Sequence, residues 1–519
     1  MVVWVGTSLK LFGGVAVVWM GTVPAYANPV GEQVVAGAAT FQRVGNSLTI
    51  QQGTDRAVIN WNQFSIAAGE TTKFVMPSAS SAALNRVLSG NPSAIYGSLQ
   101  ANGHLFLINP AGILVGPGGT VNAASFIAST RDVNTETFMR GGDLQFLGDS
   151  AASILNQGKI EASSGDVFLI AQHVENEGQL VARDGTVGMV SGTQVSLQSV
   201  GPQHFKVRLA EVSDEAKVKK DKDGVADVVN EGVIEAANAV LEATGNVGSL
   251  AINNAGTVKA TGVKPNADGS VTLTGGEGDV VNSGVIAALR KNVEGKEVGG
   301  EIRIAGRNIT TKESSLTTVA GSAGGGNIRM RATDTTLISG RVEATGYADQ
   351  AKGGRVELLG KNVGLRSGEV NADGGAKGGT VLVGGDYLGL NPEVPNALAT
   401  VITPDARISA NATVNGDGGK VIVWSDEYTG FFGSITALGG PEGGNGGFIE
   451  TSSKNNLQAF GEAQASAAKG LPGEWLLDPY NVSIVDQAPT SGGGFNGQNP
   501  DIFSPTSNDA KIYNQDIIS

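Results

Sequence analysis

The chain has 519 residues, a formal net charge of −13 and no cysteine. Its 77 glycines are about twice the usual share of ~7%, and its 16% of charged residues lie below the usual ~25%. This composition predicts many turns between short strands. It excludes a disulfide framework and thiolate metal sites, and it disfavours a nucleic-acid partner, which requires basic patches.

Residues 1–27 have the pattern of an export signal. Lys10 precedes an apolar run over residues 11–20, and Pro24 is followed by small residues that end at Ala27. The run is too short to span a bilayer. We therefore expect cleavage between Ala27 and Asn28, with an uncleaved anchor as the alternative.

Residues 106–119, FLINPAGILVGPGG, contain two apolar runs that are broken by Asn109-Pro110. Proline has no N–H for a sheet ladder and disfavours a helical residue before it, so the pair predicts a corner between two strands. We expect Asn109 to bond its own backbone and Gly112 to take a positive φ. Alternating residues of the two strands are expected to face a core: Leu105, Leu107, Ile113 and Val115.

Two repeated units follow. The unit Asn-x-Gly-x-aliphatic-x-Ala starts at Asn156, Asn176, Asn230, Asn254 and Asn282. The unit Gly-Gly-x-aliphatic-x-aliphatic starts at Gly299, Gly325, Gly353, Gly378 and Gly418. Their regular spacing, with one longer gap before Gly418, indicates one unit per structural coil and one insertion.

Apolar residues alternate within each unit, which predicts short strands with one buried face. Such strands bury little alone, but successive turns of a superhelix give each strand a parallel neighbour on both sides. The sequence therefore predicts a parallel β-helix from about residue 28 to 470. A propeller is second, because aromatic residues make up only 5% of the chain. We expect left-handed backbone at the glycine and asparagine bends, and the repeated asparagines either stack as an amide ladder or form separate turns.

Residues 59–66 (INWNQFSI), the block 84–130 and the first Asn-x-Gly repeats resemble the filamentous-haemagglutinin-type secretion domain of two-partner secretion exoproteins. The resemblance implies an all-β, right-handed parallel β-helix with an N-terminal cap and extra-helical hairpins. It also implies a dedicated outer-membrane partner barrel with periplasmic docking domains. The family's Asn-Pro-Asn-Gly-Ile motif falls on Asn109, Pro110, Ala111, Gly112 and Ile113, with Ala111 in place of the second Asn. A weaker second motif falls on Asn91 and Pro92.

These features divide the chain into an export signal (1–27), a secretion domain (28–290), a repeat stalk (291–470) and a C-terminal segment (471–519). WLLDPYNVSI, in the last segment, resembles a stretch found in large adhesins. We expect residues 485–519 to be loosely ordered and the chain to be a fragment of a longer adhesin.

The predicted function is that of a secreted, non-enzymatic, adhesin-like exoprotein of a Gram-negative-type bacterium, released or held at the outer membrane. Its N-terminal domain would act as secretion signal and folding nucleus. The expected further partner is a receptor or glycan on a host or neighbouring cell.

Two other classes are alternatives. A β-helix enzyme acting on polysaccharide needs clustered carboxylates in one groove, whereas the nearest acidic pairs, Asp214/Glu215 and Asp221/Asp223, fall in a mixed-charge run typical of a solvated loop. The stalk of a contact-dependent toxin would carry its toxic domain at a distant C-terminus.

We predict no metal or other cofactor. The glycine- and aspartate-containing segments at residues 275–281 and 415–421 lack the full spacing of calcium-binding repeats. The three histidines are far apart in the sequence: His104, His173 and His204.

Overall fold

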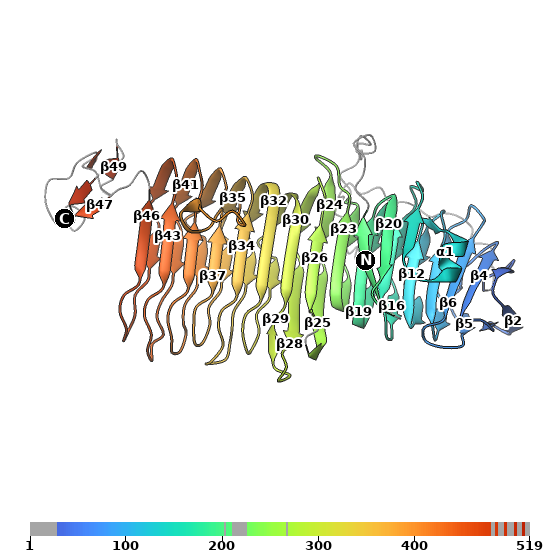
Figure 1. Cartoon of the computed structure of the whole chain (residues 1–519). Coiled ribbons are helices and arrows are strands. Elements are labelled where there is room, and N and C mark those ends of the chain that lie inside the picture. Colours follow the sequence, from blue (N-terminus) through green and yellow to red (C-terminus); the bar gives the residue numbers. More distant parts are fainter. Residues whose placement is uncertain are drawn as a thin grey trace, which may run out of the picture.

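Three parallel β-ladders run along one elongated stack of coils (Figure 1). The computed structural model describes residues 28–201, 204–209, 226–265 and 268–478, together with four short strands beyond them. After the first coils, which lack a strand in one of the ladders, each coil contributes one strand to each ladder, and strands of successive coils pair in parallel. The chain is a right-handed parallel β-helix, as predicted.

The three ladders, named A, B and C, contain the following strands. Ladder A consists of β7 (Ser93–Ile95), β10 (Ile113–Val115), β15 (Ser153–Asn156), β18 (His173–Asn176), β22 (Val228–Asn230), β24 (Leu250–Asn254), β27 (Asp279–Asn282), the second halves of β30 (Glu301–Thr311) and β32 (Asn327–Ile338), β35 (Asn362–Leu365), β38 (Ala399–Ile402), β41 (Tyr428–Phe431) and β44 (Asn456–Ala459). Ladder B consists of β3 (Ser47–Gln52), β5 (Thr71–Val75), β8 (Ser98–Ala101), β11 (Thr120–Ala123), β16 (Lys159–Ala162), the first parts of β19 (Gln179–Ser191) and β23 (Val233–Ala243), β25 (Thr257–Pro265), β28 (Val285–Lys291), β31 (Leu316–Thr318), β33 (Arg341–Glu343), β36 (Glu369–Asn371), β39 (Arg407–Ser409), β42 (Ser434–Thr436) and β45 (Glu462–Gln464). Ladder C consists of β4 (Arg56–Trp61), β6 (Ala82–Val87), β9 (His104–Ile108), β12 (Ser125–Ser129), β17 (Val167–Ala171), the second parts of β19 and β23, β26 (Ser270–Thr274), the first halves of β30 and β32, β34 (Arg355–Leu359), β37 (Thr380–Val383), β40 (Lys420–Val423), β43 (Phe448–Ser452) and β46 (Glu474–Asp478).

Alternating residues of these strands fill one continuous core. In the Gly-Gly units, the aliphatic residues that follow the glycines are buried, as in the pairs Ile302/Ile304 and Val421/Val423. The residues between them point outward. The period of two in the sequence therefore correctly predicted the inward face of the coils.

The asparagines of the Asn-x-Gly units form a ladder at the corner between ladders A and B. Each side-chain amide donates to the amide oxygen of the next coil's asparagine, at 2.8 Å from Asn156 to Asn176 and 2.7 Å from Asn230 to Asn254. The remaining steps, Asn176 to Asn230 and Asn254 to Asn282, also measure 2.8 Å. Of the two interpretations from sequence, the stacked ladder is the one observed.

The glycines of the two repeated units do not have the left-handed backbone that we expected at the bends. None of them has a φ in the left-handed region. A Cβ at Gly256 would lie 2.1 Å from the carbonyl oxygen of Gly232, and one at Gly326 would lie 2.1 Å from that of Gly300. Glycine is present because the coils approach too closely for a side chain, not because of backbone dihedrals.

A second layer covers the outer face of ladder C in the first coils. It contains helix α1 (Thr135–Arg140) and an antiparallel sheet of β13 (Asp132–Val133), β14 (Leu144–Leu147), β20 (Gln194–Ser199) and β21 (Phe205–Leu209). Phe138 of α1 packs edge-on against Phe106 of β9, with ring centroids 5.2 Å apart. All five residues of β9 are therefore buried, which explains the unbroken apolar run over residues 105–108.

An antiparallel cap begins the stack, where β1 (Gln33–Ala36) pairs with β4 and β2 (Ala39–Val44) pairs with β3. This cap and the second layer are the cap and extra-helical elements implied by the family resemblance. Further along the stack, β29 (Glu297–Gly299) pairs antiparallel with β28.

The longer repeat interval before Gly418 corresponds to an insertion over residues 384–398, which contains the short helix η2 (Tyr387–Gly389). Val394 of this insertion packs on outward residues of ladder C, including Leu382, Ile422 and Trp424. The three ladders continue through residue 290 without a break.

The expected export signal, the mixed-charge run at 211–224 and most of residues 485–519 lie outside the described residues. In that last segment, β47 (Ser483–Val485) pairs with β50 (Lys511–Tyr513), and β48 (Gly493–Phe495) pairs with β49 (Phe503–Pro505). The part of the chain that is described holds no helix long and apolar enough to cross a bilayer.

Candidate partner-recognition site

The Asn-Pro motif forms the predicted corner between β9 and β10. The side-chain oxygen of Asn109 accepts the Ala111 N–H at 2.9 Å, and its carbonyl accepts the Gly112 N–H at 3.0 Å. Gly112 has a φ of 110°. Ile113 begins β10 and points into the core, as do the other three apolar residues predicted to do so.

The corner brings the two sequence motifs together. The Asn109 side chain is fully buried and donates to the Asn91 carbonyl at 3.0 Å and to the Ser93 hydroxyl at 2.9 Å. The Gly112 carbonyl accepts the Ser93 N–H at 3.0 Å. Asn91 and Pro110 themselves are exposed, and Pro92 is half-buried. Asn109 therefore fixes the corner from inside while the two neighbouring residues face solvent.

Arg131, which sequence reasoning missed, connects this corner to the second layer. Ser150 donates to the Pro110 carbonyl at 2.6 Å, and the Ser150 carbonyl accepts from the Arg131 guanidinium. Arg131 is fully buried and also donates to the Gly192 carbonyl at 2.9 Å. Burial lowers the pKa of Arg131 below its usual range. The signal in the sequence was an arginine placed two residues after a buried strand.

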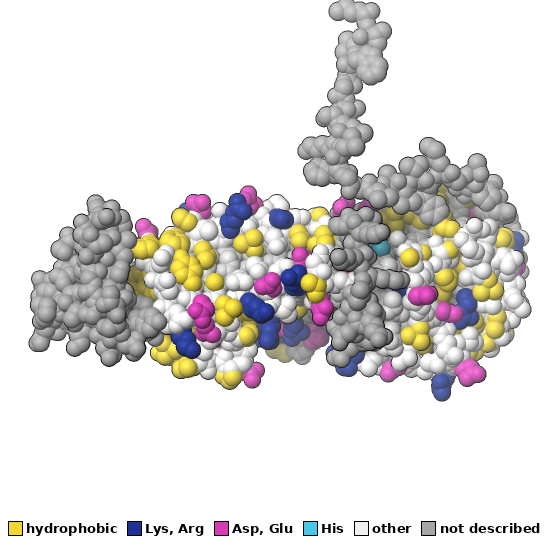
Figure 2. Space-filling view, turned by 90° about the horizontal axis from the view of Figure 1, so that it is seen from above, with side chains coloured by type: hydrophobic (Ala, Val, Ile, Leu, Met, Phe, Trp, Pro, Cys, Tyr) yellow, Lys and Arg dark blue, Asp and Glu magenta, His cyan; other side chains and the backbone are white. Residues whose placement is uncertain are grey.

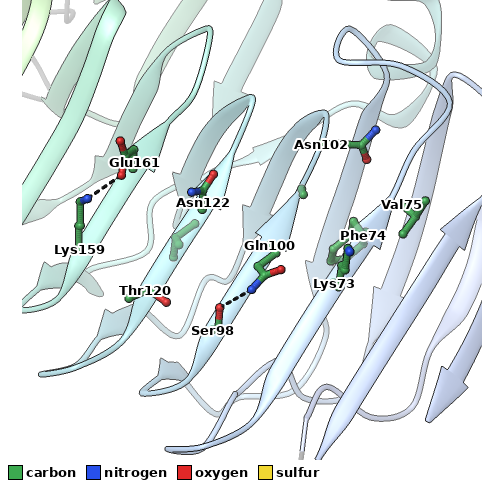
Figure 3. A pocket seen from close by; sticks show the side chains of 12 residues that line it. Lys73, Phe74, Val75, Ser98, Gln100, Asn102, Thr120, Asn122, Lys159 and Glu161 are labelled. Carbon is green, nitrogen blue, oxygen red and sulfur yellow. Dashed lines mark hydrogen bonds and ion pairs between the residues drawn. The ribbon is translucent and has the colours of Figure 1, made fainter. Parts of the chain in front are cut away.

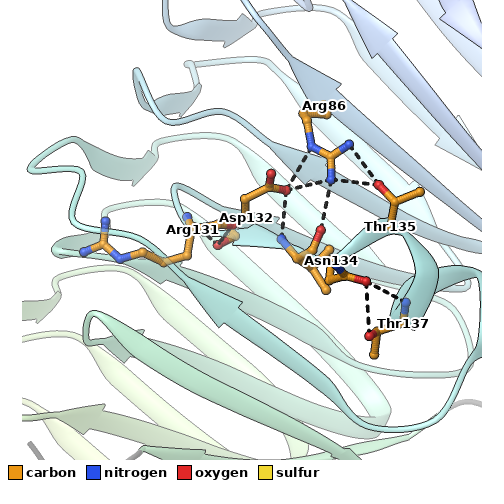
Figure 4. A network of polar contacts seen from close by, with 8 residues as sticks. Arg86, Arg131, Asp132, Asn134, Thr135 and Thr137 are labelled. Atoms are coloured by element: carbon orange, nitrogen blue, oxygen red, sulfur yellow. Dashed lines mark hydrogen bonds and ion pairs between the residues drawn. The ribbon is translucent and has the colours of Figure 1, made fainter. Parts of the chain in front are cut away.

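Arg86 of β6 holds the beginning of the second layer (Figure 4). Its guanidinium lies 2.9 Å from Asp132 and donates to the Val133 carbonyl at 2.9 Å. The Asn134 side chain then caps α1 by accepting the Thr137 N–H at 3.0 Å. These contacts tie β13 and α1 to the helical stack.

His104 and Asp166 lie where the stack meets strand β21 of the extra-helical sheet, and His204 directly precedes that strand. Asp166 is fully buried and accepts the Phe205 N–H at 2.6 Å and the Thr186 N–H at 2.8 Å. His204 Nδ1 lies 3.2 Å from Asp166. Burial lowers the pKa of His104 to about 4, so this ring is neutral near pH 7. Asp166 thus anchors β21 to the stack.

An open groove of about 730 Å³ lies on the outer face of ladder B (Figure 3). Outward side chains of four successive coils line up there: Lys73, Gln100, Asn122 and Glu161. Lys159 lies 2.6 Å from Glu161, and this contact holds the pKa of the Glu161 carboxyl below its usual range. The row offers amide, ammonium and carboxylate groups to a polar ligand.

Charges of both signs are interspersed over the face drawn in Figure 2. Neighbouring coils form ion pairs, such as Arg183 with Glu161 at 3.3 Å and with Glu235 at 3.2 Å. Among the described residues, no group of three or more histidine, aspartate or glutamate side chains is arranged to hold a metal ion.

The fold places the chain in the class of right-handed parallel β-helices with an antiparallel N-terminal cap and an extra-helical layer. The model of the TPS secretion domain family matches residues 25–288, just over half of the chain. The chain belongs to this family, which is a family of secretion domains of two-partner exoproteins and not an enzyme family.

The chain is similar to the Heme/hemopexin-binding protein of Haemophilus influenzae, with 30% identity over 305 residues, or 56% of this chain and 32% of that protein. A second protein of this name from H. influenzae is 38% identical over 106 residues, or 20% of this chain and 11% of that protein. The chain thus spans about a third of the first relative's length and less of the second's.

Among solved structures, the HMW1 secretion domain from H. influenzae matches with a TM-score of 0.51 and 26% identity, covering 87% of this chain and all of that one. The filamentous hemagglutinin secretion domain matches at 12% identity and a TM-score of 0.32, covering 72% of this chain and 97% of that one.

Proposed function

We propose that this chain is a secreted, non-enzymatic, adhesin-like exoprotein exported by two-partner secretion. In this proposal a signal peptidase removes residues 1–27, and an outer-membrane barrel with periplasmic docking domains recognises the N-terminal domain. That domain then nucleates folding of the β-helix outside the cell, where the protein is released or held at the surface. The secretion-domain match over residues 25–288 carries the proposal.

Burial separates the roles of the motif residues. Asn109 is fully buried and so offers no surface to a partner of the folded domain; its role is to build the corner. Pro110, which follows it, and Asn91, whose carbonyl it contacts, are exposed, and so is Leu88, three residues before Asn91, at 59%. We assign partner recognition to this exposed set and nucleation to the buried asparagine.

Secretion assays in cells with and without the cognate barrel test the route. We expect export of the chain to fall to background without the barrel. Export that continues at an unchanged level would overturn the proposed route.

Variants at the corner test the division of roles. Asn109→Ala should lower both the melting temperature of the purified chain and its secretion, because the buried Asn91 and Ser93 contacts are lost. The core variant Ile113→Ala serves as the control for a purely destabilising change. Leu88→Ser should leave melting unchanged and reduce secretion. The division fails if Asn109→Ala melts normally or if Leu88→Ser is secreted normally.

The groove on ladder B supports the adhesive part of the proposal. Its row of side-chain amides and charges can exchange several hydrogen bonds with hydroxyl groups, which suits a glycan. Gln100→Ala combined with Asn122→Ala should reduce binding of the purified chain to a glycan array or cell surface at unchanged stability. Lys259→Ala, on the same ladder several coils away, is the control. Equal binding by wild type and the double variant would exclude this groove.

A further inference from the structure

Asn28, the first residue after the expected cleavage point, is buried in the N-terminal cap. Only 5% of its surface is exposed, and its backbone N–H donates to the Glu70 carboxylate at 2.8 Å. Glu70 is itself only 9% exposed. A buried carboxylate therefore faces the nitrogen atom that cleavage would convert into a free amine.

The Asn28 side chain is fixed in the same place. Its amide nitrogen donates to the Asn46 carbonyl at 3.0 Å, and its oxygen accepts from the Thr72 hydroxyl at 2.9 Å. The Glu70 oxygen that faces Asn28 also accepts the Ala67 N–H at 2.9 Å. Two segments of the cap, the turn at Asn46 and residues 67–72, thus hold both the backbone and the side chain of Asn28.

The backbone of Asn28 supports a role for the cleaved form. Asn28 is one of three described non-glycine residues with a positive φ, at 56°. In an uncleaved chain this conformation brings side-chain and backbone atoms close to the preceding carbonyl. A chain that starts at Asn28 has no preceding carbonyl, so cleavage removes that unfavourable contact.

We propose that Glu70 binds the α-ammonium group of the processed chain, so that signal cleavage itself completes the N-terminal cap. Hydrolysis of the Ala27–Asn28 bond consumes one water molecule. It leaves a carboxylate on Ala27 and a primary amine on Asn28. That amine is protonated near neutral pH. The hydrogen bond between the Asn28 amide and the Glu70 carboxylate then becomes a buried ion pair. Such a pair is stronger, and removing one partner is strongly unfavourable because it leaves the other charge buried and uncompensated.

With this pairing, the stability of the cap depends on signal cleavage. Before cleavage, the hydrogen-bond donors to the Glu70 carboxylate among the described residues are the backbone amides of Asn28 and Ala67, and Asn28 keeps its left-handed backbone. After cleavage, the first coil gains an ion pair beneath the antiparallel strands β1 and β2. The inference depends on the cleavage position and not on the partner barrel, so it can fail while the proposed secretion route holds.

The test uses the full chain in two forms, one starting at Asn28 and one retaining Ala27. Each form is made with Glu70 and as Glu70→Gln, and Glu32→Gln is the control because Glu32 lies in the same cap but pairs with the Arg43 side chain. Amide hydrogen exchange over residues 66–76 reports opening of the cap. In the form starting at Asn28, Glu70→Gln should accelerate this exchange about tenfold. The form that retains Ala27 should respond much less.

Two further measurements keep the test independent of how well Glu70→Gln folds. Selective acetylation of the Asn28 amine in the wild-type processed chain should accelerate exchange in the same segment. Reductive methylation of that amine should be about tenfold slower in the wild type than in Glu70→Gln. The inference is overturned if Glu70→Gln accelerates exchange equally in both forms, or if acetylation leaves the exchange rate unchanged. It is also overturned if the Asn28 amine is methylated at the same rate in the wild type and in Glu70→Gln, or if mass spectrometry places the mature start away from Asn28.

Discussion

The neutral, buried His104 predicts a specific loss of stability in acid. Its side chain lies at the base of the extra-helical sheet, and its Nε2 has no hydrogen-bond partner among the described residues. Burial lowers its pKa from 6.5 to about 4, with Asp166 opposing and Arg56 and His204 adding to this effect. Above pH 6.5 the ring is neutral in both folded and unfolded chains, so its contribution to stability is complete.

Between pH 6.5 and pH 4 the unfolded chain binds a proton at this ring that the folded chain does not, so falling pH favours unfolding. Each pH unit in this window lowers the free energy of unfolding by about 1.4 kcal/mol, and the loss reaches about 3 kcal/mol near pH 4. His104→Phe removes the titrating group and keeps an aromatic ring opposite Phe205, whose ring centroid lies 6.4 Å away. Groups elsewhere titrate alike in both proteins and cancel in the comparison.

Urea unfolding of wild type and His104→Phe at pH 7 and pH 4.5 checks this prediction. The wild type should lose about 2 to 3 kcal/mol more than the variant over that range. Histidine C2–H exchange measured by mass spectrometry should also give His104 a midpoint near pH 4. A stability difference that does not change with pH, or a midpoint near 6.5, would refute the reasoning.

Three further substitutions test the stack itself by urea unfolding or proteolysis. Asn230→Ala, in the buried amide ladder, should lower the free energy of unfolding by about 3 kcal/mol because two neighbours lose their partners, whereas the outward Asn253→Ala should change it little. Gly256→Ala should cost about 3 kcal/mol because its Cβ meets a carbonyl at 2.1 Å, and Gly90→Ala, with open space around it, about 0.5 kcal/mol or less. Arg131→Met should expose the extra-helical sheet to limited proteolysis at a lower protease concentration, since the Gly192 and Ser150 carbonyls lose their donor; an unchanged digestion pattern would contradict this.

The sequence by itself determined the repeating architecture. Alternation with a period of two is a local property of the extended backbone, so it identified the inward faces of the strands without knowledge of their partners. The interval between repeats gave one unit per coil and located the insertion before Gly418. The Asn-Pro corner was also predictable, because proline and asparagine act on their own backbone at Asn109 and Gly112.

Only the tertiary structure decided what lies between coils and above them. Gly256 requires glycine because of a carbonyl at Gly232, and no feature of its own backbone dihedrals shows this. Arg131 and Gly192 are far apart in sequence, and the folded chain brings them into one buried contact. Glu70 meets the nitrogen of Asn28 in the same way. A sequence period encodes which way a side chain points, but the distance between two backbones depends on how the coils close and stack. These close approaches and buried polar contacts therefore appear only in the folded chain.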